Sequence, residues 1–289
     1  MPFKGVRGPR TKTMEEKNMI IEKKDAFAER KALIMKQIEE RNKRDRSFLR
    51  TGIYGEPKVC KSSLAMDSLT EQQIKDGWKV WVLDWDSGCE PTWRNNYNAA
   101  KHIEIFDPNV YNDDGSPNLE LSEQLSEDFV RMVQEALDEG TKGKFVLDGV
   151  DKWKERCFDT LTKGKKDSDF RFPPHLWGKR NRRYKLLMDK IFKLPCDVFL
   201  ITHLKDVYEG INNPNPVGKE PDWHKMTPPM LYQTISVKKM KKGNKFEHIA
   251  TIDASKTNTP LVGKRYVVLT VEDGNVVWNN IPELQEGSL

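Results

Sequence analysis

The sequence has little of what builds zinc sites, disulfide frameworks or membrane spans. Its four cysteines are widely scattered over 289 residues, and none lies in a C-x-x-C pair. Zinc sites and disulfide frameworks need closer or more regular cysteine spacing, so neither is expected. There is no apolar run near the length of a membrane-spanning helix, and no apolar signal-peptide core near the N-terminus. We therefore expect a protein of the reducing cytoplasm with no membrane partner.

Charge of one sign is not in large excess, but it is unevenly placed. The net charge is +5, whereas residues 1–50 alone carry a balance of +7 and residues 152–186 a balance of +8. Clustered basic residues favour a polyanionic partner more than the total charge does. The composition, 37% hydrophobic and 32% charged, allows an adequate core beneath a highly charged surface.

One short stretch, G-E-P-K-V-C-K-S at residues 55–62, organises the rest of the chain. It matches the phosphate-binding P-loop pattern G-x-x-x-x-G-K-[ST], except that Cys60 replaces the second glycine. A strand-like segment, 48–54, precedes it, and a helical pattern, 62–69, follows it, which is the order that a P-loop requires. The bland alternative is a strand-to-helix turn that carries a lysine by chance. The candidate nucleotide-binding residues are Gly55, Glu56, Pro57, Lys58, Val59, Cys60, Lys61, Ser62 and Ser63.

These residue types suit a nucleoside triphosphate. Successive backbone N–H groups at a helix N-terminus bind phosphate oxygens. Lys61 would reach the β- and γ-phosphates of ATP, and the Ser62 hydroxyl would ligate Mg²⁺. Cys60 departs from the pattern, because its Cβ crowds the phosphate and removes glycine's conformational freedom. Either binding is weakened or hydrolysis is lost while binding remains. A thiol at a helix N-terminus beside Lys61 is also expected to have a lowered pKa and to be reactive.

Strand-like and helical segments alternate after the P-loop. Strands are expected at 79–86, 102–107, 145–148 and 197–203, and helices at 121–140 and 180–192. Such alternation predicts an α/β fold with a mainly parallel sheet covered on both faces.

The two ends of the chain lack this alternation of strands and helices. Residues 14–44 predict a charged helix with a narrow apolar stripe, which either packs on a neighbouring subunit or folds back on its own sheet. Residues 208–230 read as a long loop. Segments 233–240, 246–254, 266–271 and 276–278 predict an antiparallel extension, with a hairpin at Asp273-Gly274-Asn275. We expect three parts: a basic tail and helical arm (1–46), an ATPase core (47–260) and a C-terminal hairpin with an acidic tail (261–289).

Polar residues at the ends of the predicted strands are candidates for chemistry. Asp148 ends an apolar strand and would hold Mg²⁺ between the phosphates. Asp86 would orient the attacking water, with Glu90 and Asp151 as competitors, since it alone is expected at the tip of its strand. His203, expected directly after the strand 198–202, would sense the γ-phosphate. For each residue the alternative is an ordinary structural role.

Together these residues resemble the RecA/RadA-like P-loop ATPases, most closely the compact single-domain type carried by phages, archaeal viruses and plasmids. The resemblance is carried by residues 55–63 and by the strands that end at Asp86, Asp148 and His203, and it covers about residues 47–260. It implies a RecA-like core with one strand between the P-loop strand and the Asp148 strand. It also implies ATP hydrolysis at subunit interfaces in a ring or filament, and DNA binding. Aspartate at position 86, where relatives often have glutamate, is a departure.

In this family two loops face the DNA, here about residues 155–180 and 206–228. The first combines basic and aromatic side chains that suit single-stranded DNA, although a solvated charged loop is the alternative. The candidate DNA-binding residues are Lys163, Lys165, Lys166, Arg171, Phe172 and Trp177. A cation from the neighbouring subunit would complete the ATP site. Lys256 is the first choice, ahead of Arg265 and Lys239.

The leading expectation is an ATP-hydrolysing, RecA-like protein that acts on single-stranded DNA in recombination, annealing or replication of a mobile genome. One rival is another DNA motor, such as a helicase or packaging ATPase. The other is a nucleotide-binding assembly module that does not hydrolyse ATP because of Cys60.

Overall fold

The computed structural model describes residues 14–42, 48–162, 174–209, 215–279 and 284, except for the side chains of 14–26 and 40. Contacts divide the chain into two units, Met1–Ser47 and Phe48–Leu289, which we describe separately. The three-part division expected from the sequence stays a prediction. Among the described residues, no helix has both the length and the apolar character to cross a bilayer.

The first unit contains one long helix, α1 (Met14–Asn42), close to the range expected from its apolar spacing. Its apolar side chains Phe27, Leu33, Ile34, Met35 and Ile38 are exposed. A helix that leaves such a stripe uncovered within its own unit needs a partner surface. Packing on a neighbouring subunit and packing on the sheet of the same chain both stay predictions.

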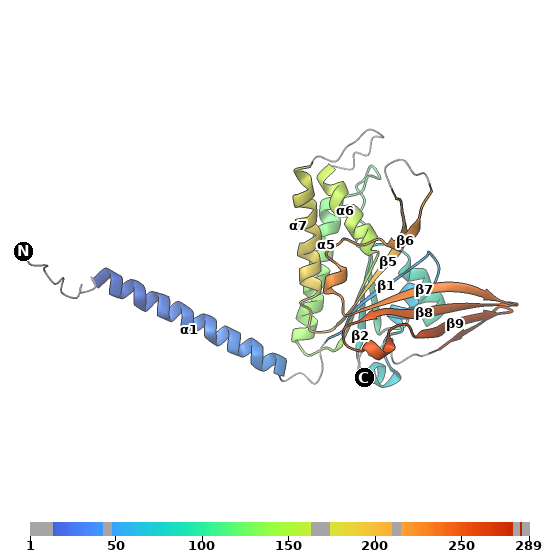
Figure 1. Cartoon of the computed structure of the whole chain (residues 1–289), viewed down its shortest axis with the longest axis horizontal. Coiled ribbons are helices and arrows are strands. Elements are labelled where there is room, and N and C mark those ends of the chain that lie inside the picture. Colours follow the sequence, from blue (N-terminus) through green and yellow to red (C-terminus); the bar gives the residue numbers. More distant parts are fainter. Residues whose placement is uncertain (1–13, 43–47, 163–173, 210–214, 280–283, 285–289) are drawn as a thin grey trace, which may run out of the picture. The chain divides into compact units, whose positions relative to one another are not determined.

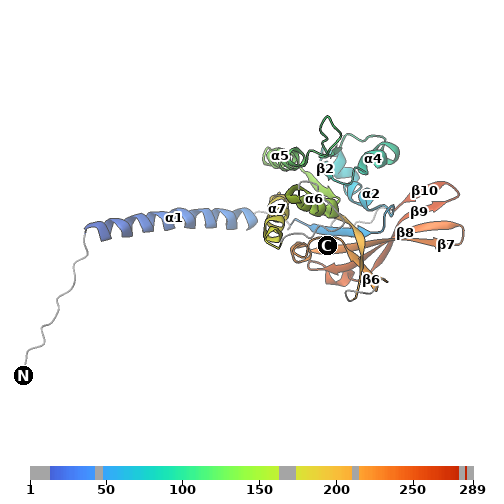
Figure 2. The same ribbon diagram turned by 90° about the horizontal axis from the view of Figure 1, so that it is seen from above.

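The second unit is a ten-stranded sheet flanked by helices (Figures 1 and 2). Its strands are β1 (Arg50–Gly55), β2 (Lys79–Asp84), β3 (Ile103–Phe106), β4 (Gly143–Asp148), β5 (Asp197–Val207), β6 (Gly218–Pro221), β7 (Gln233–Lys242), β8 (Lys245–Ser255), β9 (Arg265–Glu272) and β10 (Asn275–Trp278). Its helices are α2 (Lys61–Met66), α3 (Glu71–Lys75), α4 (Cys89–Tyr97), α5 (Leu119–Asp138), α6 (Val150–Thr162) and α7 (Leu176–Ile191), with two short 3₁₀ turns, η1 (Pro228–Met230) and η2 (Thr259–Leu261).

The strand order is β10-β9-β8-β7-β1-β5-β4-β2-β3, with β6 paired to β5 off this path. Strands β7, β1, β5, β4, β2 and β3 run parallel, and β8, β9 and β10 continue the sheet in antiparallel fashion. The expected α/β fold, with a mainly parallel sheet and a C-terminal antiparallel extension, is confirmed. The order also places β5 between the P-loop strand β1 and the Asp148 strand β4, as the family resemblance implies.

The central strands are apolar on both faces, because side chains alternate along a strand and helices cover both sides. Trp81, Phe145 and Leu200 lie in one buried cluster with residues from α5, α6 and α7. Val82 and Val146 lie in a second cluster with residues from α2. The polar ends of these strands are consequently held by a rigid, fully packed sheet.

Two loop predictions are wrong. The stretch 208–230 is not a featureless loop, because β5 continues to Val207 and pairs with β6 in an antiparallel hairpin. The stretch 155–180 begins within α6 and ends within α7. The stretch 208–230 is rich in Pro, Gly and Asn without periodicity, so β6 was hard to recognise there. The many basic residues of the stretch 155–180 made its helical pattern hard to recognise. The helices α3, α4 and α6 were also not foreseen.

Candidate nucleotide-binding site

The segment between β1 and α2 has the backbone of a tight phosphate-binding loop. A Cβ added to Gly55 would lie 2.3 Å from the carbonyl oxygen of Val237, so the strand can turn here only with glycine. Lys58 and Cys60 both have positive φ values, 62° and 63°. This left-handed region favours glycine and is strained for other residues. Cys60 therefore occupies a position where the P-loop pattern has glycine for a conformational reason.

The expectation of a reactive Cys60 is wrong. Burial raises the pKa of the Cys60 thiol to about 12, and the nearby charge of Lys61 opposes this shift only in part. The thiol precedes a helix of only six residues and packs against the apolar cluster beneath α2. Loss of solvation outweighs the helix terminus and the lysine here, so the thiol is neutral at physiological pH.

Lys61 lies in the loop with its ammonium group directed back into it. Its Nζ donates to the carbonyl oxygen of Glu56 at 2.8 Å, and the residue is buried. Burial lowers the pKa of Lys61, while the carboxylates of Asp148, Asp86 and Asp151 raise it. A buried ammonium group in this loop is placed to offset the negative charge of phosphate groups.

Ser62 and Asp148 are in contact although 86 residues separate them. The Ser62 hydroxyl donates to Oδ2 of Asp148, and the Cys89 thiol donates to the same oxygen at 3.1 Å. Burial raises the pKa of Asp148, and the bonds from Ser62 and Cys89 lower it. The structure thus brings together the two residues predicted to hold Mg²⁺.

Asp84 is a residue of this site that the sequence argument passed over. Strand β2 ends at Asp84, in register with Asp148, and Asp86 lies in the turn beyond it. The expectation that only Asp86 occupies the tip is therefore wrong. Burial and the neighbouring Asp148 raise the pKa of Asp84 to about 6, whereas backbone N–H groups of Cys89 and Gly88 lower it. The i, i+2 spacing of two aspartates at a strand end was the available signal.

The oxygen atoms gathered here fit a hard divalent cation. Asp84, Cys89 and Asp148 offer ligand atoms that all lie within 4.8 Å of one another. One Asp84 oxygen, Oδ1, is buried without a hydrogen-bond partner in the described structure. Mg²⁺ prefers carboxylate, hydroxyl and water oxygens, so Ser62, Asp148 and this orphaned oxygen suit it. The Cys89 thiol is the exception in the set.

Asp86, Asp151 and His203 form a polar cluster beside the loop. His203 lies within β5, in register with Gly55, rather than directly after a strand as expected. Its Nδ1 is 3.3 Å from Asp151, and its Nε2 is 3.8 Å from Asp86. The hydrogen bond to Asp151 raises the pKa of His203. Burial alone would raise the pKa of Asp151, but the bond and charge of His203 bring it below its usual value.

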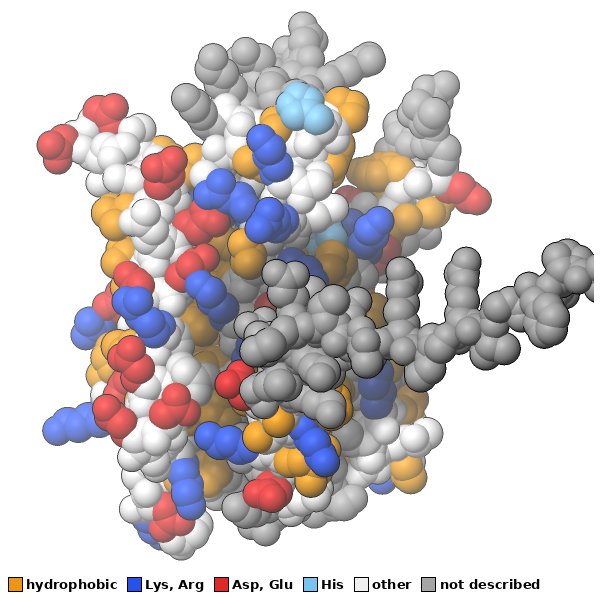
Figure 3. Space-filling view, turned by 90° about the vertical axis from the view of Figure 1, so that its left-hand side faces the viewer, with side chains coloured by type: hydrophobic (Ala, Val, Ile, Leu, Met, Phe, Trp, Pro, Cys, Tyr) orange, Lys and Arg blue, Asp and Glu red, His pale blue; other side chains and the backbone are white. Residues whose placement is uncertain are grey.

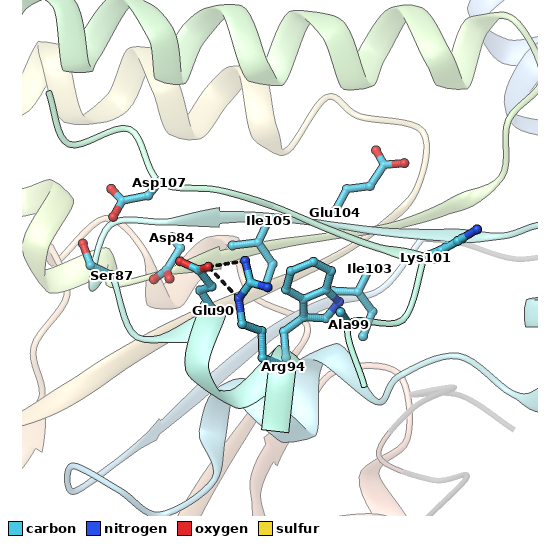
Figure 4. Close-up of a pocket in the computed structure, with 11 residues that line it drawn as sticks. Asp84, Ser87, Glu90, Arg94, Ala99, Lys101, Ile103, Glu104, Ile105 and Asp107 are labelled. Carbon is cyan, nitrogen blue, oxygen red and sulfur yellow. Dashed lines mark hydrogen bonds and ion pairs between the residues drawn. The ribbon is translucent and has the colours of Figure 1, made fainter. Parts of the chain in front are cut away.

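Glu90 points elsewhere. It forms an ion pair with Arg94 on α4 at 2.7 Å, at the rim of a hollow of about 720 Å³ (Figure 4). Asp84 also lines this hollow, which lies between α4 and the edge strand β3. Of the three carboxylates considered for orienting water, Asp86 and Asp151 thus lie with His203, and Glu90 does not.

Two predicted groups lie apart from this cluster. Lys256 follows β8 near the start of β1, at the end opposite Gly55, where its Nζ donates to the Pro229 carbonyl at 2.8 Å. Trp177 is exposed on α7, with the Arg180 guanidinium 5.1 Å from its ring. The remaining DNA-binding candidates, Lys163, Lys165, Lys166, Arg171 and Phe172, lie outside the described residues.

The helical face next to Trp177 is not uniformly basic. Figure 3 shows basic and acidic side chains intermixed over α5 and α7. Arg183 pairs with Glu123 and Lys190 with Glu127, which joins the two helices. Part of the positive charge of α7 is therefore neutralised by acidic residues of α5 within the fold.

Neither a protein-family model nor a curated protein matches this chain. Many solved structures resemble it, among them the following two. One is a KaiC-like protein from the hyperthermophilic archaeon Pyrococcus horikoshii, at 12% identity and a TM-score of 0.46, covering 80% of this chain and 90% of that one. The other is the RadB recombinase, at 13% identity and a TM-score of 0.44, covering 79% and 89%. Similarity at this level tells us nothing about what this chain binds, and its function has to be inferred from its own residues.

Proposed function

We propose that this protein binds and hydrolyses ATP with Mg²⁺ and acts on single-stranded DNA. The observation that carries the proposal is the contact between Ser62 and Asp148 beside the buried Lys61. Residues this far apart in sequence meet because the P-loop and β4 end at the same edge of the sheet. A hydroxyl, a carboxylate and a cation at a loop rich in backbone N–H groups form a site for a metal-bound triphosphate.

Each residue has a role that follows from its position. Lys61 would leave the Glu56 carbonyl and bind the terminal phosphates. Ser62 and Asp148 would hold Mg²⁺, which supplies charge neutralisation across the β- and γ-phosphate oxygens when bound. Asp86 would orient the attacking water, with Asp151 holding His203 in place. The charge required in the transition state would thus come from residues preorganised in the sheet.

His203 would report the γ-phosphate to the β5–β6 hairpin. It lies in the same strand that continues into the hairpin, and Lys219 on β6 pairs with Glu56 of the P-loop at 2.5 Å. A shift of His203 upon phosphate loss would therefore change the position of both strands of the hairpin. The hairpin occupies most of the second loop expected to face DNA.

The proposed nucleic-acid role has a separate basis. It depends on the basic segment with Lys163, Lys165, Lys166, Arg171 and Phe172, together with the exposed Trp177. Phosphate contacts by lysine and stacking by aromatic rings are the usual means of binding single strands. We further propose that Lys256 acts on the site of a neighbouring subunit in a ring or filament, since it cannot reach its own P-loop from the opposite end of β1.

Measured ATP turnover, with and without single-stranded DNA, tests this function. We expect Mg²⁺-dependent phosphate release that rises when DNA is added and is lost in Asp148→Asn. Turnover without any response to DNA would favour another role for the ATPase. A strand-displacement assay distinguishes a helicase-like motor from an annealing or recombination protein.

One observation favours a second function, that of a nucleotide-binding assembly module without hydrolysis. The Cys60 backbone adopts the left-handed conformation with a side chain that glycine would not have. If that side chain blocks the productive phosphate position, ATP would bind and persist. Single-turnover measurement with radiolabelled ATP decides between the two functions.

A further inference from the structure

The ligand atoms gathered beside the P-loop include one that magnesium does not use. Those of Asp84, Cys89 and Asp148 all lie within 4.8 Å of one another, and each of the three residues is at most 3% exposed. Mg²⁺ is bound by oxygen atoms, whereas a thiolate sulfur binds softer divalent ions such as Zn²⁺. A magnesium site alone therefore does not account for a cysteine between two aspartates.

Cys89 is held facing Asp148 at a distance that suits metal ligands. It is the first residue of α4, and its backbone N–H donates to Oδ2 of Asp84 at 2.7 Å. Its thiol donates to Oδ2 of Asp148 at 3.1 Å. Around a tetrahedral zinc ion, with bonds of about 2.3 Å to sulfur and about 2.0–2.2 Å to oxygen, a sulfur and an oxygen ligand lie roughly 3.5 Å apart. The thiol and the Asp148 carboxylate need to separate only slightly to admit such an ion.

Asp84 has an oxygen atom that nothing in the described structure uses. Its Oδ2 accepts the Cys89 N–H, whereas Oδ1 is buried and has no hydrogen-bond partner among the described residues. A buried carboxylate oxygen without a partner costs free energy, because it has lost water and gained no replacement. A cation bound by Oδ1 would remove that cost.

The hollow between α4 and β3 gives an ion a route to Asp84. This hollow of about 720 Å³ is lined by four acidic residues, Asp84, Glu90, Glu104 and Asp107, and by two basic ones (Figure 4). A cleft with an excess of negative charge concentrates cations. A divalent ion can therefore approach Asp84 from the side of β3.

We propose that Asp84, Cys89 and Asp148 form a site for Zn²⁺, which displaces Mg²⁺ and switches the ATPase off. When zinc binds, the S–H bond of Cys89 breaks, a Zn–S bond forms and the proton passes to solvent. The ion thus takes the place of the proton that the thiol donates to Asp148, and water fills the fourth position of a tetrahedral site. Because both metals need Asp148, they cannot be bound together. Cysteine spacing could not reveal this site, since it contains a single thiol.

Absorption of cobalt tests the metal–thiolate bond directly. Co²⁺ is added alone to the full chain without nucleotide, because a cobalt–thiolate bond gives a charge-transfer band in the near ultraviolet. We expect this band in the parent, its removal by added Zn²⁺, and its loss in Cys89→Ser. Cys157→Ser, which removes another buried thiol on α6, is the matched control and should keep the band. A band that persists in Cys89→Ser overturns the proposal.

Calorimetry with Zn²⁺ alone measures the contribution of each ligand. Cys89→Ser should weaken zinc binding at least about a hundredfold, since even groups that only support a ligand contribute about 10–100-fold. It should also reduce the number of protons released on binding. Asp84→Asn, which keeps the size of the side chain, should weaken binding as well, and it provides the test if Cys89→Ser does not fold. A zinc affinity that neither substitution changes overturns the proposal.

ATP turnover tests the regulatory part, which rests on the proposed function. Zn²⁺ should inhibit phosphate release in the parent and in Cys157→Ser, and Cys89→Ser should need at least about a hundredfold more zinc for the same inhibition. Added Mg²⁺ should relieve the inhibition, because the two ions compete for Asp148. Inhibition that ignores both Mg²⁺ and Cys89 overturns the switch. If no variant hydrolyses ATP but the cobalt band depends on Cys89, the proposed ATPase function fails and the zinc site stands.

Discussion

The parallel core and the antiparallel extension belong to one sheet but bury their side chains to different extents. Strands β2 and β4 are buried along nearly their whole length, whereas β7 is exposed from Lys238 onward and β10 is mostly exposed. In Figure 1 the strands β7, β8 and β9 project beyond the helices. Asp84 and Asp148 occupy the last positions of β2 and β4, and this places both carboxylates beside the P-loop.

The extension contributes to the same site by a different route. Val237 of β7 and Ala250 of β8 lie in the same buried cluster as Val59 of the P-loop. The core thus supplies the chemical groups, and the extension supplies contacts that shape the loop. Substitutions in the two regions should accordingly alter different properties, and experiments can test this difference.

The largest expected effect belongs to the core. Lys61→Ala should remove measurable ATP binding, because the buried ammonium that offsets the phosphate charge is absent from the variant. Lys241→Ala, an exposed lysine on β7, is the matched control and should bind ATP as the parent does. Calorimetry measures both. Equal affinities in the parent and Lys61→Ala would refute the P-loop assignment.

The strands of the core and of the extension were both predictable from the sequence, β7 to β10 to within two residues, whereas several of the helices were not foreseen. Five strands of the core were foreseen from short apolar runs, because a strand buried on both faces leaves an uninterrupted pattern. The contact of Ser62 with Asp148 followed from the topology that those runs implied. Strand ends were less certain, so Asp84 was assigned to the strand interior and His203 to a strand end.

The rest could not be read from local pattern. The helices α3 and α6 have 5 and 13 residues and carry several charged side chains, which makes their helical pattern hard to recognise in the sequence. The pKa of Cys60 depends on tertiary burial, which a motif does not report. The approach of Gly55 to the Val237 carbonyl joins segments far apart in the sequence, and the pairing of β7 with β1 brings them together.

A second comparison concerns stability. Leu147→Ala should lower the free energy of unfolding by about 2–5 kcal/mol, because Leu147 is fully buried in β4 and its truncation leaves a cavity. Val277→Ala on the exposed strand β10 should change it by less than about 0.5 kcal/mol. Denaturant unfolding followed by circular dichroism measures both. Similar losses of stability would mean that the extension is as tightly packed as the core.

Cys60→Gly should show whether the shape of the P-loop limits ATP binding or turnover. Relief of a strained left-handed residue is worth on the order of 1–3 kcal/mol, so we expect tighter ATP binding or faster turnover. Alkylation of the parent protein at pH 7.5 should be slow, since the raised pKa leaves little thiolate. Rapid modification of Cys60, followed by mass spectrometry, would contradict the buried, neutral thiol described here.

The histidine of the core gives a pH-dependent test. The pKa of His203 is raised in the folded protein by its bond to Asp151, so its protonated form stabilises the fold. That stabilisation is complete below the ordinary histidine pKa and is lost as pH rises through the raised value. The stability difference between the parent and His203→Gln should therefore be larger at pH 5.5 than at pH 8.5. A difference independent of pH would argue against a charged His203.

The smallest effects per residue concern nucleic acid, and they ask which region binds it. The segment before α7 carries Lys163, Lys165 and Lys166, and the extension carries exposed lysines of its own, including Lys238, Lys239 and Lys241. We expect the first set to bind. Changing each to glutamate should weaken single-strand binding equally across sequences, because phosphate contacts carry no base information.

Salt dependence decides between the two sets of lysines. Removing one phosphate-binding lysine of the first set should lower the slope of log K against log salt by about 0.7. Trp177→Ala should cost about 1–3 kcal/mol if its ring stacks on a base. Lysine-to-glutamate changes at 238, 239 and 241 should leave the slope unchanged. This part of β7 extends beyond β1 and pairs with β8 alone, and lysines on such an open strand edge chiefly prevent pairing with other strands. A reduced slope in this second set, with no change in the first, would transfer DNA binding from the core to the extension.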